Sequence, residues 1–357
     1  MALSYRRILV VQTAFVGDVI LSLPLVQEAA RIAPPGAEID LLTLPRWQNL
    51  LETHPSISTL WLYDKHGQER GVGAFWRLCR GLRRRRYQLA LVPHRSLRSA
   101  LLVWLAGIPR RIGFDRSPGR FLFTEAVPYR QHWHEARRNL SLLEPLGYRH
   151  RALVRPQIAF TAADEQAVAG WLSRKGVGKE RPLVVLAPGS VWATKRWPGE
   201  RFADLARKLA QSGFAVALVG GKEDRALCDA IVRRAGGFAF NGAGRLTLRQ
   251  SACLIARARL LVGNDSAPVH LAWAVGTPVV ALFGPTVPEF GFFPPGPEDK
   301  IVQRSELACR PCNRHGPARC PLKNHRCMKD IPLEQVWPVV ADCLQVPTHP
   351  QEGGVVR

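Results

Sequence analysis

Residues 260–285, LLVGNDSAPVHLAWAVGTPVVALFGP, combine in one stretch the elements that decide the fold. An apolar run from Ala258 to Val262 ends at small and polar residues, and a helical pattern then continues to Gly276. This order predicts a buried strand, a loop and the start of a helix. The unpaired N–H groups and the dipole at a helix start favour an anion. The stretch therefore predicts an α/β fold with an anion-binding loop, and a diphosphate is the expected ligand of this loop.

A second polar stretch, PGSVWATKRWP at 188–198, follows another apolar strand pattern. Its lysine, Lys195, can supply a full positive charge to the same phosphate. The alternative is that Lys195 and Arg196 form an exposed pair before a helix that Pro198 opens. Trp197 does not decide between the two, because a tryptophan at this position can simply pack.

Strand-like and helix-like patterns alternate along the rest of the chain. This alternation is typical of a parallel α/β sheet, and a polar stretch near residue 160 divides the chain into two such α/β segments. We therefore expect two doubly wound domains, 1–160 and 161–357, that face a cleft with ligands at the carboxyl ends of their strands. The predicted strands are 6–12, 39–43, 60–63, 89–92, a strand from 183, 215–219, 259–262 and 279–283, and predicted helices include 163–174 and 199–212.

The charge is strongly positive in both halves of the chain. The formal net charge is +22, with 22 Lys and Arg against 11 Asp and Glu in residues 1–150. Residues 77–120 contain twelve arginines and one acid, Asp115. Such a surplus is either a solvated surface or an attraction for polyanions, meaning nucleic acid, an anionic membrane or an acidic glycolipid. No run approaches the ~20 apolar residues of a membrane span, and the start has no leader-like apolar core, so a cytoplasmic protein is expected.

Six segments in order carry a resemblance to a known family. They are ILVVQTAFVGDVILSLPLVQEA, SLRSALLVWLAGIPRRIGF, HEARRNLSLLEPLG, PGSVWATKRWP, LVGGKED and GNDSAPVHLAWAVGTPVVALFGPT. Together they resemble the ADP-heptose:lipopolysaccharide heptosyltransferases of glycosyltransferase family 9, and the heptosyltransferase II branch most closely. The resemblance implies the GT-B fold of two Rossmann-like domains. It also implies transfer of L-glycero-D-manno-heptose from ADP-heptose with inversion and without a catalytic metal.

The same resemblance implies roles for single residues. Asp18, in the Gly-Asp motif, is the expected base for the acceptor hydroxyl, although a first-turn helix acid is the alternative. Lys195 is expected to stabilise the departing diphosphate. Asp265 is expected beside the donor sugar, or as a helix N-cap, or both. Glu223 matches the position that contacts the ribose, with Asp224 as an equally good candidate from the residues alone. The remaining expected donor contacts are Ser190, Thr194, Ser266 and Ala267.

The acceptor is expected to be the anionic lipid A, Kdo and heptose inner core at the cytoplasmic face of the inner membrane. Its phosphates and carboxylates suit bidentate arginines. Arg95, Arg98 and Arg138 are the candidates in the first domain, while Arg137 and Arg138 can equally form structural salt bridges. His270, one helical turn after Asp265, is expected to be a packed helix residue and not a base.

Four of the eight cysteines form a cluster in ACRPCNRHGPARCPLKNHRCM, at Cys309, Cys312, Cys320 and Cys327. This crowding favours thiolates around a structural zinc or iron, with reduced free thiols as the alternative. Some members of the resembled family carry an iron-bound four-cysteine finger at this place. The other four cysteines lie in apolar helix-like surroundings and are expected in the core.

Two further functions remain open. A high pI, an arginine run and a ribbon-like cysteine cluster are also signs of a nucleic-acid-binding protein, but few aromatic residues interleave the arginines and no nucleic acid is expected. Transfer of another sugar nucleotide on the same fold, or transfer of heptose to a protein, is the nearer alternative.

Overall fold

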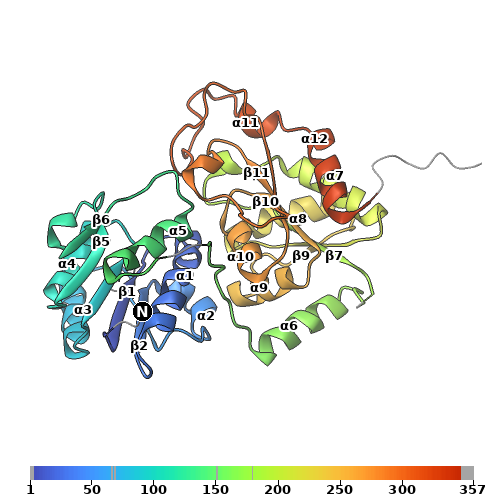
Figure 1. Ribbon diagram of the computed structural model, residues 1–357. Coiled ribbons are helices and arrows are strands. Elements are labelled where there is room, and N and C mark those ends of the chain that lie inside the picture. The colour runs from blue at the N-terminus through green and yellow to red at the C-terminus, as the bar shows by residue number, and fades with distance from the viewer. Residues whose placement is uncertain (1–3, 66, 68–69, 150–151, 179, 347–357) are drawn as a thin grey trace, which may run out of the picture. The chain divides into compact units, whose positions relative to one another are not determined.

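The computed structural model describes residues 4–65, 67, 70–149, 152–178 and 180–346. The chain divides into two compact units, Met1–Thr161 and Ala162–Arg357, which we call unit 1 and unit 2. Each unit contains one six-stranded sheet, and every strand pair within it is parallel (Figure 1).

The sheet of unit 1 has the strand order β3-β2-β1-β4-β5-β6, so the order reverses between β1 and β4. Helices α3 and α4 cover one face, where their apolar side chains pack with those of β1, β2 and β4. The strands are β1 (Arg7–Val11), β2 (Glu38–Thr43), β3 (Thr59–Leu62), β4 (Leu89–Val92), β5 (Arg110–Phe114) and β6 (Glu125–Val127). The helices are α1 (Val16–Ile32), α2 (Gln48–Leu51), α3 (Val72–Arg84), α4 (Leu97–Leu105) and α5 (Glu135–Leu140), with 3₁₀ turns η1 (Pro45–Trp47), η2 (Arg120–Leu122) and η3 (Ser141–Leu146).

The sheet of unit 2 repeats this topology as β12-β11-β10-β7-β8-β9, with the reversal between β7 and β10. Its strands are β7 (Leu183–Ala187), β8 (Ala215–Leu218), β9 (Phe240–Asn241), β10 (Leu260–Asn264), β11 (Val279–Phe283) and β12 (Lys300–Gln303). The helices are α6 (Ala162–Ser173), α7 (Gly199–Gln211), α8 (Arg225–Arg234), α9 (Leu248–Ala256), α10 (Ala267–Val275), α11 (Arg326–Lys329) and α12 (Leu333–Leu344), with η4 (Ala193–Lys195), η5 (Lys222–Asp224) and η6 (Pro288–Phe290).

The strands form as near-continuous apolar runs because both faces of each sheet are covered. The four side chains from Ile8 to Val11 in β1 are fully buried. The five side chains of β7 are also buried, and among them only Leu183 is slightly exposed. The alternation of these runs with amphipathic helices is what the sequence shows, and the expected α/β class with two doubly wound domains is confirmed. The sequence does not predict strands β5, β6, β9 and β12. Strands β6 and β9 are only three and two residues long, and β5 and β12 begin with charged residues, so neither pair forms a long apolar run.

One glycine permits the central pairing of unit 2. Gly263 in β10 lies opposite Ala187 in β7. A Cβ on Gly263 would lie 2.9 Å from the Ala187 Cβ and 3.2 Å from the Ala187 carbonyl oxygen, which is closer than real Cβ atoms approach carbon. The close approach brings the ends of these two strands, and the loops that follow them, side by side.

Among the described residues, no helix combines the length and the apolar character that crossing a bilayer would need.

Candidate active site

The polar residues of unit 2 gather at the carboxyl ends of β7 and β10, where the strand order reverses. Open α/β sheets bind ligands at such a reversal. Residues 188–192 lead from β7 into η4, and Asp265 with Ser266 joins β10 to α10. We call this cluster the unit 2 site. It contains both polar stretches that the sequence singles out, and the fold brings them together across about seventy positions of the chain.

An ion pair joins the two stretches. The Lys195 Nζ atom donates to Asp265 Oδ2 at 2.6 Å and to the Asp265 carbonyl at 3.2 Å. The two side chains are only 12% and 6% exposed, so the pair is weakly screened. Thr286 Oγ1 donates to the same carboxylate oxygen at 2.6 Å. Lys195 is therefore held at the start of α10, where an anion would meet both its charge and the helix N-terminus.

Asn264 connects the backbones of the two loops. Its Oδ1 accepts from the Trp197 N–H at 2.9 Å, and its Nδ2 donates to the Pro188 carbonyl at 2.8 Å. Asn264 is fully buried, and Trp197 is 2% exposed in the core of unit 2. The packed tryptophan is thus part of the loop's support. Sequence reasoning missed Asn264 because an asparagine before an aspartate is also an ordinary turn residue.

The other expected donor residues are half-buried or buried. Ser266 is the N-cap residue of α10 and Ala267 its first helical residue, both half-buried. The Ser190 carbonyl accepts two bonds from Arg196, at 2.9 and 2.6 Å. Thr194 is buried, and its hydroxyl donates to the Pro317 carbonyl at 2.5 Å. Thr194 therefore supports the loop in this structure.

Glu223 and Asp224 have different surroundings at the end of β8. Glu223 is exposed. Asp224 is buried, and its Oδ2 accepts from the Gly221 N–H at 3.1 Å. Burial raises the pKa of the Asp224 carboxyl above its usual value, while the Gly221 N–H opposes the rise. Asp224 thus shapes the turn, which leaves Glu223 as the carboxylate that a ligand can reach.

The unit 1 site is the corresponding cluster at the reversal between β1 and β4. Asp18 lies half-buried in the first turn of α1, which follows β1. Arg95 follows β4, and its guanidinium lies 4.2 Å from the centre of the Tyr129 ring. The negative charge of Asp18 and the positive charge of Arg95 both act on the pKa of Arg138, so the three groups lie within electrostatic reach.

Arg138 itself is buried. Its Nη2 lies 2.6 Å from Glu135 Oε2, and its Nη1 donates to the Gln131 carbonyl at 2.6 Å. Burial lowers the pKa of Arg138, and the Glu135 charge opposes this effect. With its side chain 1% exposed, Arg138 has no surface to offer an acceptor. Of the two roles that the sequence leaves open, the structural salt bridge is the one found.

Lys65 is a member of the unit 1 site that sequence reasoning missed. Its Nζ donates to the Thr13 carbonyl at 2.7 Å. Burial lowers the pKa of Lys65, and the nearby charges of Arg98 and Arg46 lower it further. Its signal in the sequence is a lysine two residues after an apolar strand pattern. Four cations, Arg46, Lys65, Arg95 and Arg98, thus lie at the carboxyl edge of this sheet.

The expected metal centre at the four clustered cysteines is not shown by the structure. All four clustered cysteines lie in the described part of the chain, where no three His, Cys, Asp or Glu side chains are grouped so that they could hold a metal ion. Cys309 is exposed, whereas Cys327 is buried at the start of α11. Cys312 Sγ lies 3.5 Å from the Cys309 carbonyl and Cys320 Sγ lies 3.9 Å from Asn324 Oδ1. The charges of Cys309, Cys312 and Cys320 all raise the pKa of Cys327, after burial, so the four thiols lie within electrostatic reach of one another. As placed, the four thiols do not fit a tetrahedral site.

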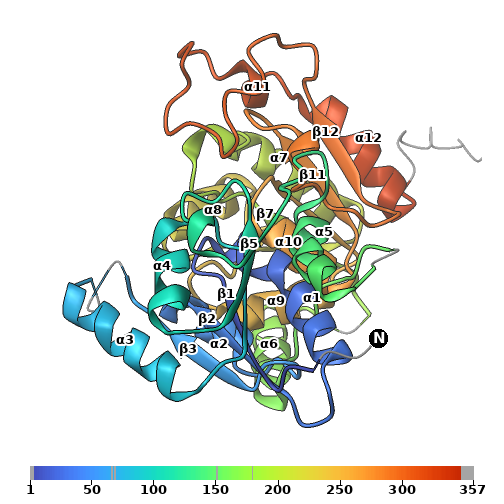
Figure 2. The same ribbon diagram turned by 60° about the vertical axis from the view of Figure 1, so that its left-hand side comes forward.

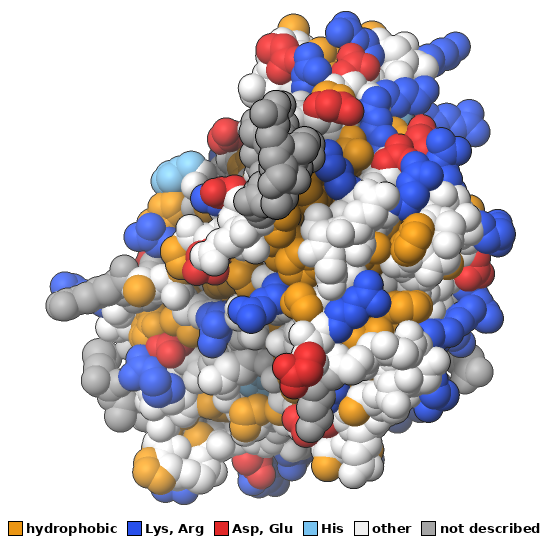
Figure 3. All heavy atoms as spheres, turned by 90° about the vertical axis from the view of Figure 1, so that its right-hand side faces the viewer, with side chains coloured by type: hydrophobic (Ala, Val, Ile, Leu, Met, Phe, Trp, Pro, Cys, Tyr) orange, Lys and Arg blue, Asp and Glu red, His pale blue; other side chains and the backbone are white. Residues whose placement is uncertain are grey.

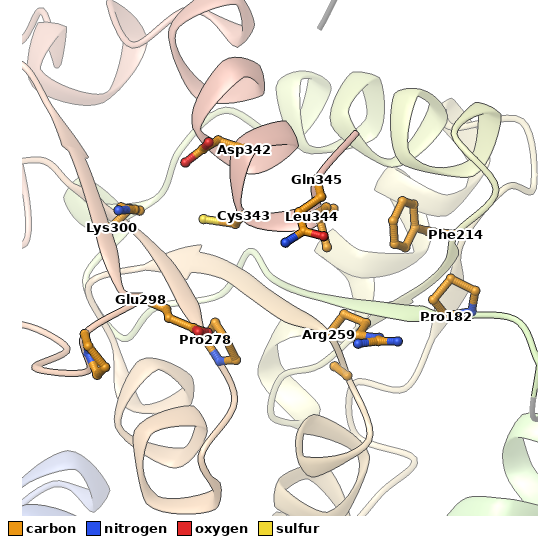
Figure 4. A pocket seen from close by; sticks show the side chains of 12 residues that line it. Pro182, Phe214, Arg259, Pro278, Glu298, Lys300, Asp342, Cys343, Leu344 and Gln345 are labelled. Carbon is orange, nitrogen blue, oxygen red and sulfur yellow. The ribbon is translucent and has the colours of Figure 1, made fainter. Parts of the chain in front are cut away.

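A hollow of about 730 Å³ lies elsewhere in unit 2. Figure 4 shows its lining side chains, which include Pro182, Arg259 and Pro278 from the residues just before β7, β10 and β11. The C-terminal end of α12 supplies Cys343, Leu344 and Gln345. These residues mark the amino ends of the strands. The hollow is thus at the sheet edge opposite the unit 2 site, and its size alone does not make it the ligand site.

Comparisons with known proteins agree with this geometry. A family profile described as "Glycosyltransferase family 9 (heptosyltransferase)" matches residues 75–322. Lipopolysaccharide heptosyltransferase 2 of Salmonella typhimurium is 31% identical over 80% of this chain and 84% of its own. Lipopolysaccharide heptosyltransferase 1 of Pseudomonas aeruginosa is 27% identical over 92% of both chains.

Solved structures show the same fold. The structure named E. coli ADP-heptose lps heptosyltransferase II has a TM-score of 0.77 at 27% identity, and the match covers 95% of this chain and 98% of that one. A glycosyl transferase family 9 structure from Veillonella parvula has a TM-score of 0.83 at 24% identity, with coverage of 97% and 99%.

The buried His270 leads to a pH prediction for the unit 2 site. Burial lowers the pKa of His270 from 6.5 to about 4, and the Lys195 charge also lowers it while the Asp265 charge opposes. His270 is therefore protonated below about pH 6.5 in the unfolded chain but only below about pH 4 in the folded chain. As the pH falls from 6.5 to 4, proton binding favours the unfolded chain, and the free energy of unfolding decreases. Between pH 7 and pH 5 we expect the wild type to lose about 2 kcal/mol more than a His270→Gln variant. Urea denaturation at both pH values measures this, and equal losses would contradict the assignment.

Proposed function

Because the chain belongs to glycosyltransferase family 9, the heptosyltransferases, we propose that it transfers L-glycero-D-manno-heptose from ADP-heptose to the inner core of lipopolysaccharide. The observation that carries the proposal is the Lys195–Asp265 pair at the start of α10. It puts a full positive charge beside helix N–H groups, as a departing diphosphate requires. The choice of ADP-heptose as donor follows the name of the solved relative that is 27% identical.

In this proposal unit 2 binds the donor. Lys195 and the amides of Ser266 and Ala267 hold the diphosphate, and the exposed Glu223 holds the ribose hydroxyls. The Asp265 carboxylate keeps Lys195 in place and lies where it can accept a hydroxyl of the sugar. Charge that develops on the leaving oxygen as the anomeric C–O bond breaks is met by a cation that is already in position.

Unit 1 supplies the base and binds the acceptor. Asp18 takes the proton of the attacking hydroxyl as the new glycosidic bond forms on the face opposite the leaving group, which gives inversion. Arg95, Arg98 and Lys65 are cations suited to the phosphates and carboxylates of the acceptor. Arg138 holds Tyr129 behind Arg95, since its guanidinium lies 4.9 Å from the Tyr129 ring centre.

We propose a heptosyltransferase II type of acceptor, one that already carries heptose. The support is the higher identity to a heptosyltransferase 2, 31%, than to a heptosyltransferase 1, 27%. The test incubates purified protein with ADP-heptose and either Kdo-bearing or heptosylated core, and analyses the product by mass spectrometry. A gain of one heptose on the heptosylated core alone is the expected result. Transfer only from another sugar nucleotide, or only to a protein, would replace this proposal.

Asp18 can be tested as the base. Asp18→Asn should lower kcat by a factor on the order of 10² to 10⁴ while ADP affinity stays near the wild-type value, because the carboxylate acts on the acceptor. The matched control is Glu200→Gln, which changes an exposed first-turn acid of α7. Full turnover by the Asp18 variant would remove Asp18 from the mechanism.

Lys195 can be tested as the diphosphate ligand. Lys195→Ala should lower kcat roughly a hundredfold and weaken product inhibition by ADP, because its charge acts in both the ground and the transition state. Lys195→Arg should recover part of the loss. Lys300→Ala is the control, since Lys300 is exposed at the amino end of β12. Inhibition by ADP that is the same in the wild type and in Lys195→Ala would contradict the role.

We further propose that unit 1 docks on an anionic membrane surface. The outer sides of α3, α4 and η2 expose Val72, Trp76, Trp104 and Phe121, at 74%, 44%, 48% and 74%. The two longer helices contact each other and lie on one flank of unit 1 in Figures 1 and 2. We call this surface the α3–α4 face. Tryptophan beside arginine suits the interface between lipid headgroups and acyl chains.

The charge of the α3–α4 face fits anionic lipid. Arg80, Arg83, Arg84 and Arg86 line a hollow of about 670 Å³ at the end of α3. On the face shown in Figure 3, by contrast, Lys and Arg are dispersed among acidic and apolar side chains. The partner we commit to is therefore a bilayer with anionic headgroups, to which each basic residue contributes about 1 kcal/mol.

Vesicle sedimentation tests this docking. A triple Arg80→Ala, Arg83→Ala, Arg84→Ala variant should bind anionic vesicles roughly a hundredfold more weakly than wild type, and moderate salt should release the wild type. The control is the triple Arg174→Ala, Arg233→Ala, Arg234→Ala, which removes the same charge from exposed positions of unit 2. Equal weakening by both triples, or binding that ignores salt, would leave the α3–α4 face as solvated surface.

A further inference from the structure

We propose that the cysteine-rich segment, residues 304–328, is a strap that positions Lys195 for the reaction. This rests on the proposed function only in that Lys195 meets the diphosphate. The segment runs from the end of β12 into α11 and is mostly irregular, as the long loops leading to α11 in Figure 2 show. We assign its positioning contacts to Gly316, Pro317 and His325.

Two hydrogen bonds tie the strap to the residue before Lys195. His325 Nε2 donates to the Thr194 carbonyl at 2.5 Å, since a carbonyl oxygen can only accept. Thr194 Oγ1 donates to the Pro317 carbonyl at 2.5 Å. Thr194 is buried, so both bonds are protected from water. They fix the short η4 turn from two sides, using groups more than 120 positions away in the chain.

The strap also touches the stem of Lys195. A Cβ on Gly316 would lie 3.2 Å from both Cγ and Cε of Lys195 and 3.3 Å from Pro285 Cγ. Gly316 has φ +83°, a left-handed conformation that suits glycine. The lysine stem therefore passes directly against a backbone that carries no side chain, and its ammonium ends on Asp265. Backbone contact along the stem limits the rotations that would otherwise spread the charge over several positions.

The strap is anchored on the loop that also holds Asp265. The Cys312 N–H donates to the Pro285 carbonyl at 2.9 Å, and Arg310 Nη2 donates to the Thr286 carbonyl at 2.8 Å. Thr286 is the residue whose hydroxyl bonds Asp265 Oδ2. The strap that contacts Lys195 and the hydroxyl that bonds Asp265 are thus both attached to the same short segment, the three residues after β11.

The far end of the strap is fixed at the same support. A Cβ on Gly284 would clash with Met328 Sδ and would lie 3.6 Å from Cys327 Sγ. Met328 is fully buried. His325 has φ 55°, an uncommon conformation for a residue with a side chain, and it is the N-cap residue of α11. Backbone in such a region persists where the surroundings fix it, and it often accompanies a functional constraint.

The consequence for the reaction is one of placement. A charge that is displaced by about 1 Å from the reacting groups can cost a hundredfold in rate. His325, Pro317 and Gly316 touch Lys195 or its neighbour and none of the reacting atoms, so they are positioning residues. Loss of the strap should therefore change how Lys195 is presented while unit 2 remains folded.

The test compares His325→Ala, His325→Gln and Gly316→Ala with Leu322→Ala, which alters an exposed side chain of the same segment. The first readout is the rate at which an amine reagent labels Lys195, measured by peptide mass spectrometry with Lys300 as internal reference. The second is ADP affinity with kcat and KM for ADP-heptose. Circular dichroism checks that each variant is folded.

We expect labelling of Lys195 to rise at least fivefold in His325→Ala and Gly316→Ala, with kcat reduced tenfold or more. His325→Gln, which keeps an N–H donor, should return within about threefold of wild type, and Leu322→Ala should match wild type. In a Lys195→Ala background, His325→Ala should weaken ADP binding no further, because the two act through one charge. Labelling that stays at the wild-type rate in both folded strap variants would overturn the proposal. If labelling rises as expected but the wild-type protein does not use ADP-heptose, the strap proposal stands and the proposed donor is wrong.

Discussion

The close pairing of β7 with β10 is the constraint on which the unit 2 site depends. Gly263 lets the two strands approach at Ala187, and the two loops that follow then leave the sheet side by side. Asn264 closes the remaining gap with one bond to each loop. Only in this arrangement can a lysine from one loop pair with the aspartate of the other. The ion pair is therefore a product of backbone geometry, and solvent screens it only weakly because both side chains are nearly buried.

The unit 1 site depends on a balance of charges. Four cations lie at one sheet edge, and the imidazole of His94 between them is kept neutral by burial and by two of the same cations. Burial lowers the pKa of His94 to about 4, and Lys65 and Arg95 lower it as well. A neutral imidazole can bond Thr13 and Ser99 without adding to the repulsion. The remaining positive charge can attract an anionic ligand to this sheet edge, and the Asp18 carboxylate lies within the same electrostatic field.

The sequence predicted most of the fold and the main residues of the unit 2 site, for a physical reason. Buried parallel strands are long apolar runs, and Lys195 and Asp265 each follow such a run, so their meeting at one edge is a property of the topology. It could not predict Asn264, Thr286 or Lys65, whose importance lies in contacts made across the chain. Arg138 was ambiguous because a buried and an exposed arginine look alike until Glu135 is seen beside it.

The cysteine-rich segment shows what cysteine spacing alone leaves open. A C-x₂-C pair predicts a metal when its partners can turn toward it, but a segment must also satisfy its own backbone and pack its ends. Here the buried end, at Cys327 and Met328, packs against Gly284. The middle of the segment forms hydrogen bonds with the loop that carries Lys195 and with the loop that follows β11. The segment that the cysteine spacing marks as a metal finger thus also contacts the unit 2 site, through Pro317 and His325.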